Sequence, residues 1–142
     1  MELKPPEATQ RWPFVLPGAK AVLFTSQTRT SGFGASNIDV ASLQDGSRKT
    51  LVKGGTYPRY LQAPDGAGYL LYVTNNTLFA VGFDAGALTV RGTPVPITPV
   101  AYSEQFGSAQ VDVASGPQGT GVLLHRPPEG SAPGELVNLQ WL

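Results

Sequence analysis

The stretch Gly66-Ala-Gly-Tyr-Leu-Leu-Tyr-Val-Thr-Asn-Asn-Thr-Leu-Phe-Ala-Val-Gly-Phe83 decides the fold of this sequence. It carries no charge over 18 residues, which is the length of a membrane-spanning helix. Asn75 and Asn76 interrupt it at the centre, however, and asparagine tolerates the positive φ that a two-residue hairpin turn requires. The stretch therefore predicts two β-strands, over 69–74 and 77–83, joined by an Asn-Asn turn.

Two other segments share the pattern of this region: a short strand, a turn rich in proline and glycine, and a strongly apolar strand. The three segments are 11–25, 58–74 and 109–126. Their apolar pairs, which are Leu23-Phe24, Leu71-Tyr72 and Leu123-Leu124, are spaced by 48 and then 52 residues. Such a period is typical of a repeat architecture, in which each unit packs against its neighbours.

Further strands follow each apolar pair. Where apolar and polar residues alternate, we expect the third strand of each unit, over 37–43, 77–83 and 135–141. We expect a fourth strand in the first two units, over 48–52 and 94–98. Four antiparallel strands per unit at this period are typical of the blades of a β-propeller. The third unit has no fourth strand, because the chain stops at Leu142.

The sequence therefore predicts an all-β fold, a partial β-propeller with two complete four-stranded blades and three strands of a third. The expected boundaries are an N-terminal arm at 1–10, blade 1 at 11–53, blade 2 at 54–99 and an incomplete blade 3 at 100–142. A β-sandwich of about eleven strands is the alternative, but it gives no reason for the repeating order of strands.

Composition excludes several other classes of protein. The 142 residues include 17 Gly and 13 Pro, which cut helices short and exclude a helix bundle. A hydrophobic fraction of 41% is too high for a disordered chain. Ten basic residues balance ten acidic ones, so nothing suggests nucleic acid or an anionic membrane as a partner.

Two further absences in the sequence bear on its location and chemistry. The chain has no cysteine, which excludes disulfides and thiolate metal sites without fixing the compartment. Its first ten residues contain no apolar core, so we expect no signal peptide in this chain and a cytoplasmic location as expressed.

Three runs of the sequence carry a resemblance to a known family. They are Arg11-Trp-Pro-Phe-Val-Leu-Pro-Gly-Ala-Lys-Ala-Val-Leu-Phe-Thr25, Gly54-Gly-Thr-Tyr-Pro-Arg-Tyr-Leu61 and Leu71-Tyr-Val-Thr-Asn-Asn-Thr-Leu-Phe-Ala-Val-Gly-Phe-Asp84, the last followed by Leu88-Thr-Val-Arg-Gly-Thr-Pro-Val-Pro96. These runs resemble the WD40-like, TolB-type propeller repeats at the C-terminal, extracytoplasmic end of some bacterial serine/threonine kinases and related sensors.

The resemblance covers residues 11 to 126 and is more specific for the fold than for the function. Propellers of this type usually have six or more blades, so the chain resembles about half of one. The family implies an interaction or sensing scaffold with no catalysis of its own. No kinase motif is present in the sequence, since it has neither a Gly-rich phosphate loop followed by a strand lysine nor a His-Arg-Asp triplet.

Arginine and aromatic residues gather at the start of the innermost strands of the first two units. Arg11 and Trp12 lie there in the first unit, and Tyr57, Arg59 and Tyr60 in the second. Aromatic rings beside arginine can bind peptides, sugars or anions, so these five residues are candidate ligand-binding residues at the mouth of the central channel. Packing between blades is the alternative explanation, because propellers need large side chains at this level.

No pattern indicates catalysis, a cofactor or a metal. A catalytic triad or a histidine metal site would have to use His125, the only histidine, and no Gly-x-Ser-x-Gly or His-Glu-x-x-His motif occurs. The acidic residues are scattered singly, whereas a calcium loop needs several oxygen ligands at short spacing. We therefore expect a non-enzymatic protein, in which His125 has a packed or rim position.

An incomplete ring should expose apolar faces at both of its ends, and a second copy packed head to tail would cover them. Two chains would then form a six-bladed ring, so we expect a homodimer. Residues 1–71 carry a net charge of +3 and residues 72–142 one of −3, which would orient such a joint. The expected interface residues are Leu3, Ile38, Leu136, Leu139 and Trp141.

The leading hypothesis is thus a scaffold that assembles into a closed ring. We also expect the arm at 1–10 of one chain to cover the open edge of the third blade of its partner, because bare strand edges invite aggregation. The alternative is a sensor that binds a sugar, peptide or anion at the channel mouth. A hydrolase or lyase that uses acidic residues in the channel is a third and weaker hypothesis.

Overall fold

The computed structural model describes residues 3, 5–28, 32–115, 121–130 and 138–141, and at residues 115 and 138–141 it describes the backbone alone. Within these residues the chain forms thirteen strands in four antiparallel sheets, two short 3-10 turns, η1 (Pro17–Ala19) and η2 (Phe33–Ala35), and no α-helix. The expected all-β fold is confirmed. In the described part of the chain, no helix is long and apolar enough to cross a membrane.

The first sheet contains four strands that are hydrogen-bonded in chain order: β1 (Glu7–Val15), β2 (Ala21–Thr28), β3 (Asn37–Ser42) and β4 (Arg48–Lys53). β1 begins before its expected start at Arg11, because Thr9 and Gln10 already pair with Gln27 and Ser26 of β2. Residues 7–10, which we expected to belong to the arm at 1–10, are therefore part of β1 in the chain's own sheet.

The second sheet also has four strands in chain order: β5 (Thr56–Gln62), β6 (Gly68–Thr74), β7 (Thr77–Asp84) and β8 (Thr89–Pro99). The predicted Asn-Asn hairpin is confirmed. Asn75 and Asn76 have φ angles of 48° and 61°, and Thr74 pairs with Thr77 across the turn. β8 is longer than expected, because it pairs with β7 well before Pro94.

The third sheet has the three strands β11 (Val111–Ser115), β12 (Gly121–His125) and β13 (Asn138–Trp141), again in chain order. A two-stranded sheet that the sequence did not predict precedes it, formed by β9 (Tyr102–Ser103) and β10 (Ser108–Ala109). The turn of this hairpin reaches back to the second sheet, where the hydroxyl of Thr56 donates to the carbonyl oxygen of Gly107 at 2.8 Å.

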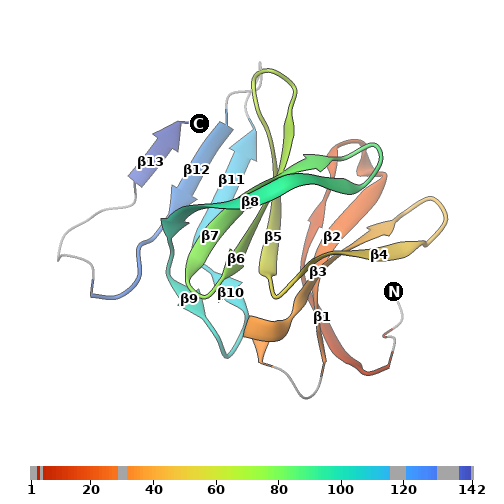
Figure 1. The fold of residues 1–142 in the computed structure, drawn as a ribbon, viewed down its shortest axis with the longest axis horizontal. Coiled ribbons are helices and arrows are strands. Elements are labelled where there is room, and N and C mark those ends of the chain that lie inside the picture. The colour runs from red at the N-terminus through yellow and green to blue at the C-terminus, as the bar shows by residue number, and fades with distance from the viewer. Residues whose placement is uncertain (1–2, 4, 29–31, 116–120, 131–137, 142) are drawn as a thin grey trace.

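Figure 1 shows the large sheets side by side, with β5 in the middle. β5 contacts β1, β2 and β3 of the first sheet and β11 of the third. Two apolar cores follow from this arrangement. The core between the first and second sheets includes Leu23, Ile38, Tyr60, Leu70 and Val81, and the core between the second and third includes Leu61, Leu71, Leu78, Val111 and Leu123.

The third unit is shifted by one residue relative to the repeat expected from the sequence. Leu23 and Leu71 each face the sheet that follows their own, whereas Leu123 packs into the core shared with the preceding sheet. Successive side chains of a strand point to opposite faces, so a shift of one residue exchanges the faces. Leu124, rather than Leu123, is therefore the structural counterpart of Leu23 and Leu71.

The outward face of the first sheet carries a polar cover. Arg48 lies between the carboxylates of Glu7 and Asp39, with Nη1 3.0 Å from Glu7 Oε2 and Nε 3.1 Å from Asp39 Oδ2. Its guanidinium carbon lies 4.7 Å from the ring centre of Phe24, which is almost completely buried. The hydrogen bond to Glu7 raises the pKa of Arg48. We expected an exposed apolar face at both ends of the incomplete ring, but at this end Arg48 covers Phe24.

Candidate functional site

The innermost strands of the first two sheets contain matching irregularities. Trp12 in β1 and Tyr57 in β5 both have a φ of 58° and both precede a proline. The strand register shifts at each of these positions, between Arg11 and Phe14 and between Thr56 and Arg59. Such bulges re-aim side chains, and here they turn an aromatic ring of each strand toward the other.

The two rings meet across the boundary between the sheets. Their centres are 5.3 Å apart at an angle of 55°, which lies within the range of favourable aromatic pairs. The indole nitrogen of Trp12 also donates to the carbonyl oxygen of Phe106, in the turn between β9 and β10, at 3.3 Å. Trp12 therefore connects three of the four sheets.

Arg59 adds a polar connection to the third sheet. Its Nε donates to Asp112 Oδ1 at 2.9 Å and its Nη1 to the carbonyl oxygen of Pro58 at 3.0 Å. The guanidinium carbon lies 4.0 Å from the ring centre of Tyr57 and 5.7 Å from that of Phe14. Through Phe14, Tyr57 and Asp112, Arg59 joins the three large sheets. Because its side chain is only 14% exposed, little of its surface is left to contact a ligand.

The other two predicted ligand-binding residues lie apart from this cluster. Arg11 is exposed, with its guanidinium carbon 5.1 Å from the ring centre of Phe33. Tyr60 is buried in the first core, edge-on to Phe83 at 6.2 Å, because it follows Arg59 on the strand and points to the opposite face. Burial, and secondarily the charge of Asp84, raises the pKa of Tyr60. Tyr60 thus packs in the core, where a ligand cannot reach it.

A pocket of about 300 Å³ lies beside Tyr57. The other residues that border it come from the end of β10, from the link before β11, from β11 and β12 themselves, and from the residue after β12: Ala109, Gln110, Val111, Asp112, Leu124, His125 and Arg126. One cation, one carboxylate and one amide thus surround a partly apolar floor. Sequence reasoning missed Gln110 and Arg126, because nothing in the pattern signals the β9–β10 hairpin that brings this link beside Tyr57.

His125 has the packed position expected from the sequence. It is 7% exposed, and its Nδ1 makes no hydrogen bond to any described residue. Across the described residues, no group of three or more His, Asp or Glu side chains is arranged to hold a metal.

The predicted interface residues have different surroundings. Leu3 is 46% exposed, whereas Ile38 is 0% exposed and lies in the core between the first two sheets. The second sheet of the same chain covers Ile38, so a partner cannot contact it, and its assignment to the interface is wrong. Leu139 and Trp141 lie in β13, where their backbones pair with Leu124 and Val122. Leu136 falls outside the described residues.

An apolar groove of about 310 Å³ lies between the second and third sheets. Leu71 and Leu78 border it on one side and Leu123 on the other, with Val95 and Ile97 of β8 at its outer rim. Since Val95 and Ile97 are both exposed, the two sheets diverge toward their outer strands.

No family model matches the sequence, and neither a curated protein nor a solved structure matches it. The resemblance to TolB-type repeats therefore stays a prediction.

Proposed function

We propose that this chain is a binding or interaction scaffold without catalysis of its own, formed by about half of a β-propeller whose remaining blades a second copy supplies. The observation that carries the proposal is the central position of β5 between the innermost strands β1 and β11. In a propeller, consecutive sheets pack face to face and their first strands line one axis. The matching bulges at Trp12 and Tyr57 support the assignment of β1 and β5 as equivalent strands.

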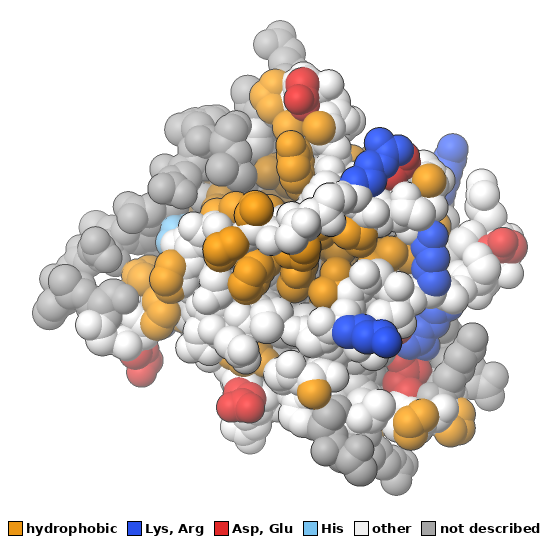
Figure 2. Space-filling view, viewed as in Figure 1, with side chains coloured by type: hydrophobic (Ala, Val, Ile, Leu, Met, Phe, Trp, Pro, Cys, Tyr) orange, Lys and Arg blue, Asp and Glu red, His pale blue; other side chains and the backbone are white. Residues whose placement is uncertain are grey.

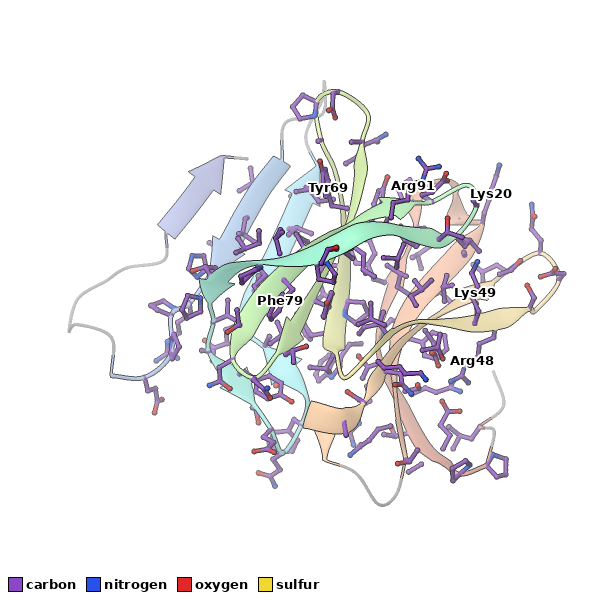
Figure 3. All side chains as sticks on the ribbon, viewed as in Figure 1. Lys20, Arg48, Lys49, Tyr69, Phe79 and Arg91 are labelled. Carbon is purple, nitrogen blue, oxygen red and sulfur yellow. The ribbon has the colours of Figure 1, made fainter. Side chains whose placement is uncertain are left out.

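The outermost strands are protected against pairing with another chain. β4 carries Arg48, Lys49 and Lys53, and β8 contains Pro94, Pro96 and Pro99. Charged residues and prolines on edge strands oppose the addition of a further strand. Figure 2 shows Lys and Arg side chains along one side of the molecule, on the right of the view. Figure 3 labels Lys20, Arg48, Lys49 and Arg91 on that side. The proposed contact therefore uses sheet faces instead of sheet edges.

The outward face of the third sheet is the best candidate for this contact. Leu124 is 43% exposed on that face, beside the partly buried Val122. The outward face of the first sheet, in contrast, has its polar cover at Arg48. In the proposed ring, this face, which carries Leu124 between Asp112 and Arg126, packs against the polar first sheet of the next chain, and charged groups on both surfaces orient the contact.

The proposal is tested by replacing an exposed leucine on the proposed face. Leu124→Glu should convert a dimer into a monomer in light scattering, because a carboxylate would be buried in the joint. Val95→Glu is the matched control, since Val95 is similarly exposed but lies on the outermost strand β8, and this variant should keep the mass of the unmodified protein. Loss of the dimer in both variants, or in neither, would contradict the assigned face.

A second candidate function is the binding of a small ligand in the pocket beside Tyr57. The pocket favours it, because oppositely charged side chains border the pocket together with an apolar floor. A ligand that binds only the folded state raises the melting temperature, so a thermal-shift screen of sugars, peptides, anions and amino acids tests this function independently of the mass.

A further inference from the structure

The pocket beside Tyr57 lies along the edge of β11 that no described strand pairs with. β11 pairs with β12 alone in the described sheet. Side chains from both faces of this sheet border the pocket, since Val111 and Asp112 are consecutive and therefore point to opposite sides. An edge strand also leaves alternate backbone N–H and C=O groups unpaired, so a ligand at this edge meets backbone hydrogen-bonding groups as well as side chains.

Arg126 provides a cation that no described residue neutralises. Its Nη1 donates to the side-chain oxygen of Gln110 at 3.3 Å, and no described carboxylate lies within ion-pair distance of it. The side chain is exposed at the border of the pocket. A planar guanidinium held on one side by an amide presents its remaining donors to an acceptor, and a carboxylate is the acceptor that matches them best.

Asp112 provides an oriented carboxylate in the same pocket. Its Oδ1 accepts hydrogen bonds from Arg59 Nε at 2.9 Å and from its neighbour's backbone N–H, that of Val113, at 3.0 Å. Its Oδ2 accepts no hydrogen bond from any residue that the structure describes, and the side chain is 68% exposed. An ammonium group is the complementary donor for such an oxygen.

The two charged residues stand on one face of the third sheet at a fixed spacing. Asp112 pairs with Leu124, and Arg126 follows two residues after Leu124. Diagonal neighbours of this kind have Cα atoms about 7–8 Å apart, which leaves room for one small group between their side chains. The floor between them is apolar at Leu124, and a volume of about 300 Å³ limits the ligand to a small molecule.

We propose that this pocket binds a free α-amino acid with an apolar side chain. The ligand carboxylate pairs with Arg126, the ligand ammonium group contacts Asp112 Oδ2, and the ligand side chain lies on Leu124. This inference rests on the second candidate function and specifies its ligand class. Because Leu124 belongs both to the pocket and to the proposed contact face, ring closure and ligand binding compete for this surface.

Calorimetric titration of the unmodified protein with three related compounds tests the proposal. L-leucine carries both charges, L-leucinamide lacks the carboxylate, and 4-methylpentanoate lacks the ammonium group. We expect leucine to bind and each of the other two to bind at least about tenfold more weakly, because each loses one charge-assisted hydrogen bond. Absence of leucine binding at millimolar concentration, or equal binding of all three compounds, would overturn the proposal.

A pair of variants assigns the binding to this pocket. Arg126→Gln should weaken leucine binding about tenfold or more and leave leucinamide binding unchanged, since only the carboxylate contact is lost. Arg91→Gln is the control, because Arg91 is an exposed arginine on β8 that pairs with Asp84 outside the pocket. Inorganic phosphate is titrated in parallel. Phosphate binding as tight as that of leucine, or leucine binding unaffected by Arg126→Gln, would overturn the assignment.

The mass of each sample, measured in the same buffer, separates this proposal from the ring. A monomer that binds leucine would support the ligand site and contradict the ring. A dimer that binds none of the compounds would support the ring and contradict the ligand site.

Discussion

The rings of Trp12 and Tyr57 lie 5.3 Å apart, although they belong to different sheets. The same local feature of the backbone sets the position of each ring. In both strands a residue with positive φ precedes a proline and shifts the register. A non-glycine residue in this conformation costs of order 1–3 kcal/mol, which the surrounding contacts must offset. The ring pair and the hydrogen bond from Trp12 to Phe106 are contacts of that kind.

Trp12→Ala should destabilise the chain by about 2 kcal/mol, because it removes a partly buried ring and leaves the carbonyl of Phe106 without its donor. Trp12→Phe keeps an aromatic ring and loses only the indole N–H, so it should cost about 1 kcal/mol. Denaturant unfolding measures both values. An alanine variant within about 0.5 kcal/mol of the unmodified protein would show that the ring pair contributes little.

Arg48→Ala should cost about 3–5 kcal/mol, because it leaves the carboxylates of Glu7 and Asp39 buried beside each other without a cation and uncovers Phe24. Arg91→Ala is the matched control. Arg91 pairs with Asp84 at an exposed site, so its loss should change the free energy of unfolding by less than about 1 kcal/mol. Equal effects of the two variants would contradict the role of Arg48 as the cover of the first sheet.

Acid should weaken the turn between β3 and β4. Hydrogen bonds with the side chain of Ser42, and then from the backbone and hydroxyl of Ser47, lower the pKa of Asp45 from 3.8 to about 2. A carboxyl group whose pKa is lower in the folded state stabilises it above the unfolded value, and this contribution is lost as the pH falls through about 2. NMR titration should show Asp45 ionising near pH 2, and a midpoint near 3.8 would contradict the turn geometry.

Substitution of Pro94 and Pro96 by threonine should increase aggregation with little change in stability, because threonine restores N–H donors on the outermost strand β8. Light scattering over time, at a fixed concentration, compares the double variant with the unmodified protein. Aggregation at the unmodified rate would show that β8 is protected by another feature.

Local patterns in the sequence were sufficient to predict most strands. Asn75-Asn76 identified a hairpin through its tolerance of positive φ, and alternation identified β3 and β7. The hairpin of β9 and β10 was missed because two-residue strands leave no periodic signal. The shift of the third unit was missed for a related reason, since Leu123 and Leu124 are both apolar and either could face the core.

The candidate site depends on features that a single sequence does not display. A bulge at Tyr57 decides which residues of β5 face the core, so Arg59 joins the cluster with Tyr57 while Tyr60 points into the core. The sequence assigned Ile38 to the interface between copies, because a single sequence does not show that the second sheet packs over this residue. Arg126 follows a strand in a region without a motif, and only its position opposite Gln110 links it to the pocket.

The mass of the unmodified protein in solution tests the proposed ring most directly. Light scattering at micromolar concentration should give twice the 14.9 kDa of one chain, because a second copy is needed to cover the exposed Leu124 on the outward face of the third sheet. A trimer or larger closed assembly would correct only the number of copies. A monomer at every concentration up to the millimolar range would contradict the proposed ring.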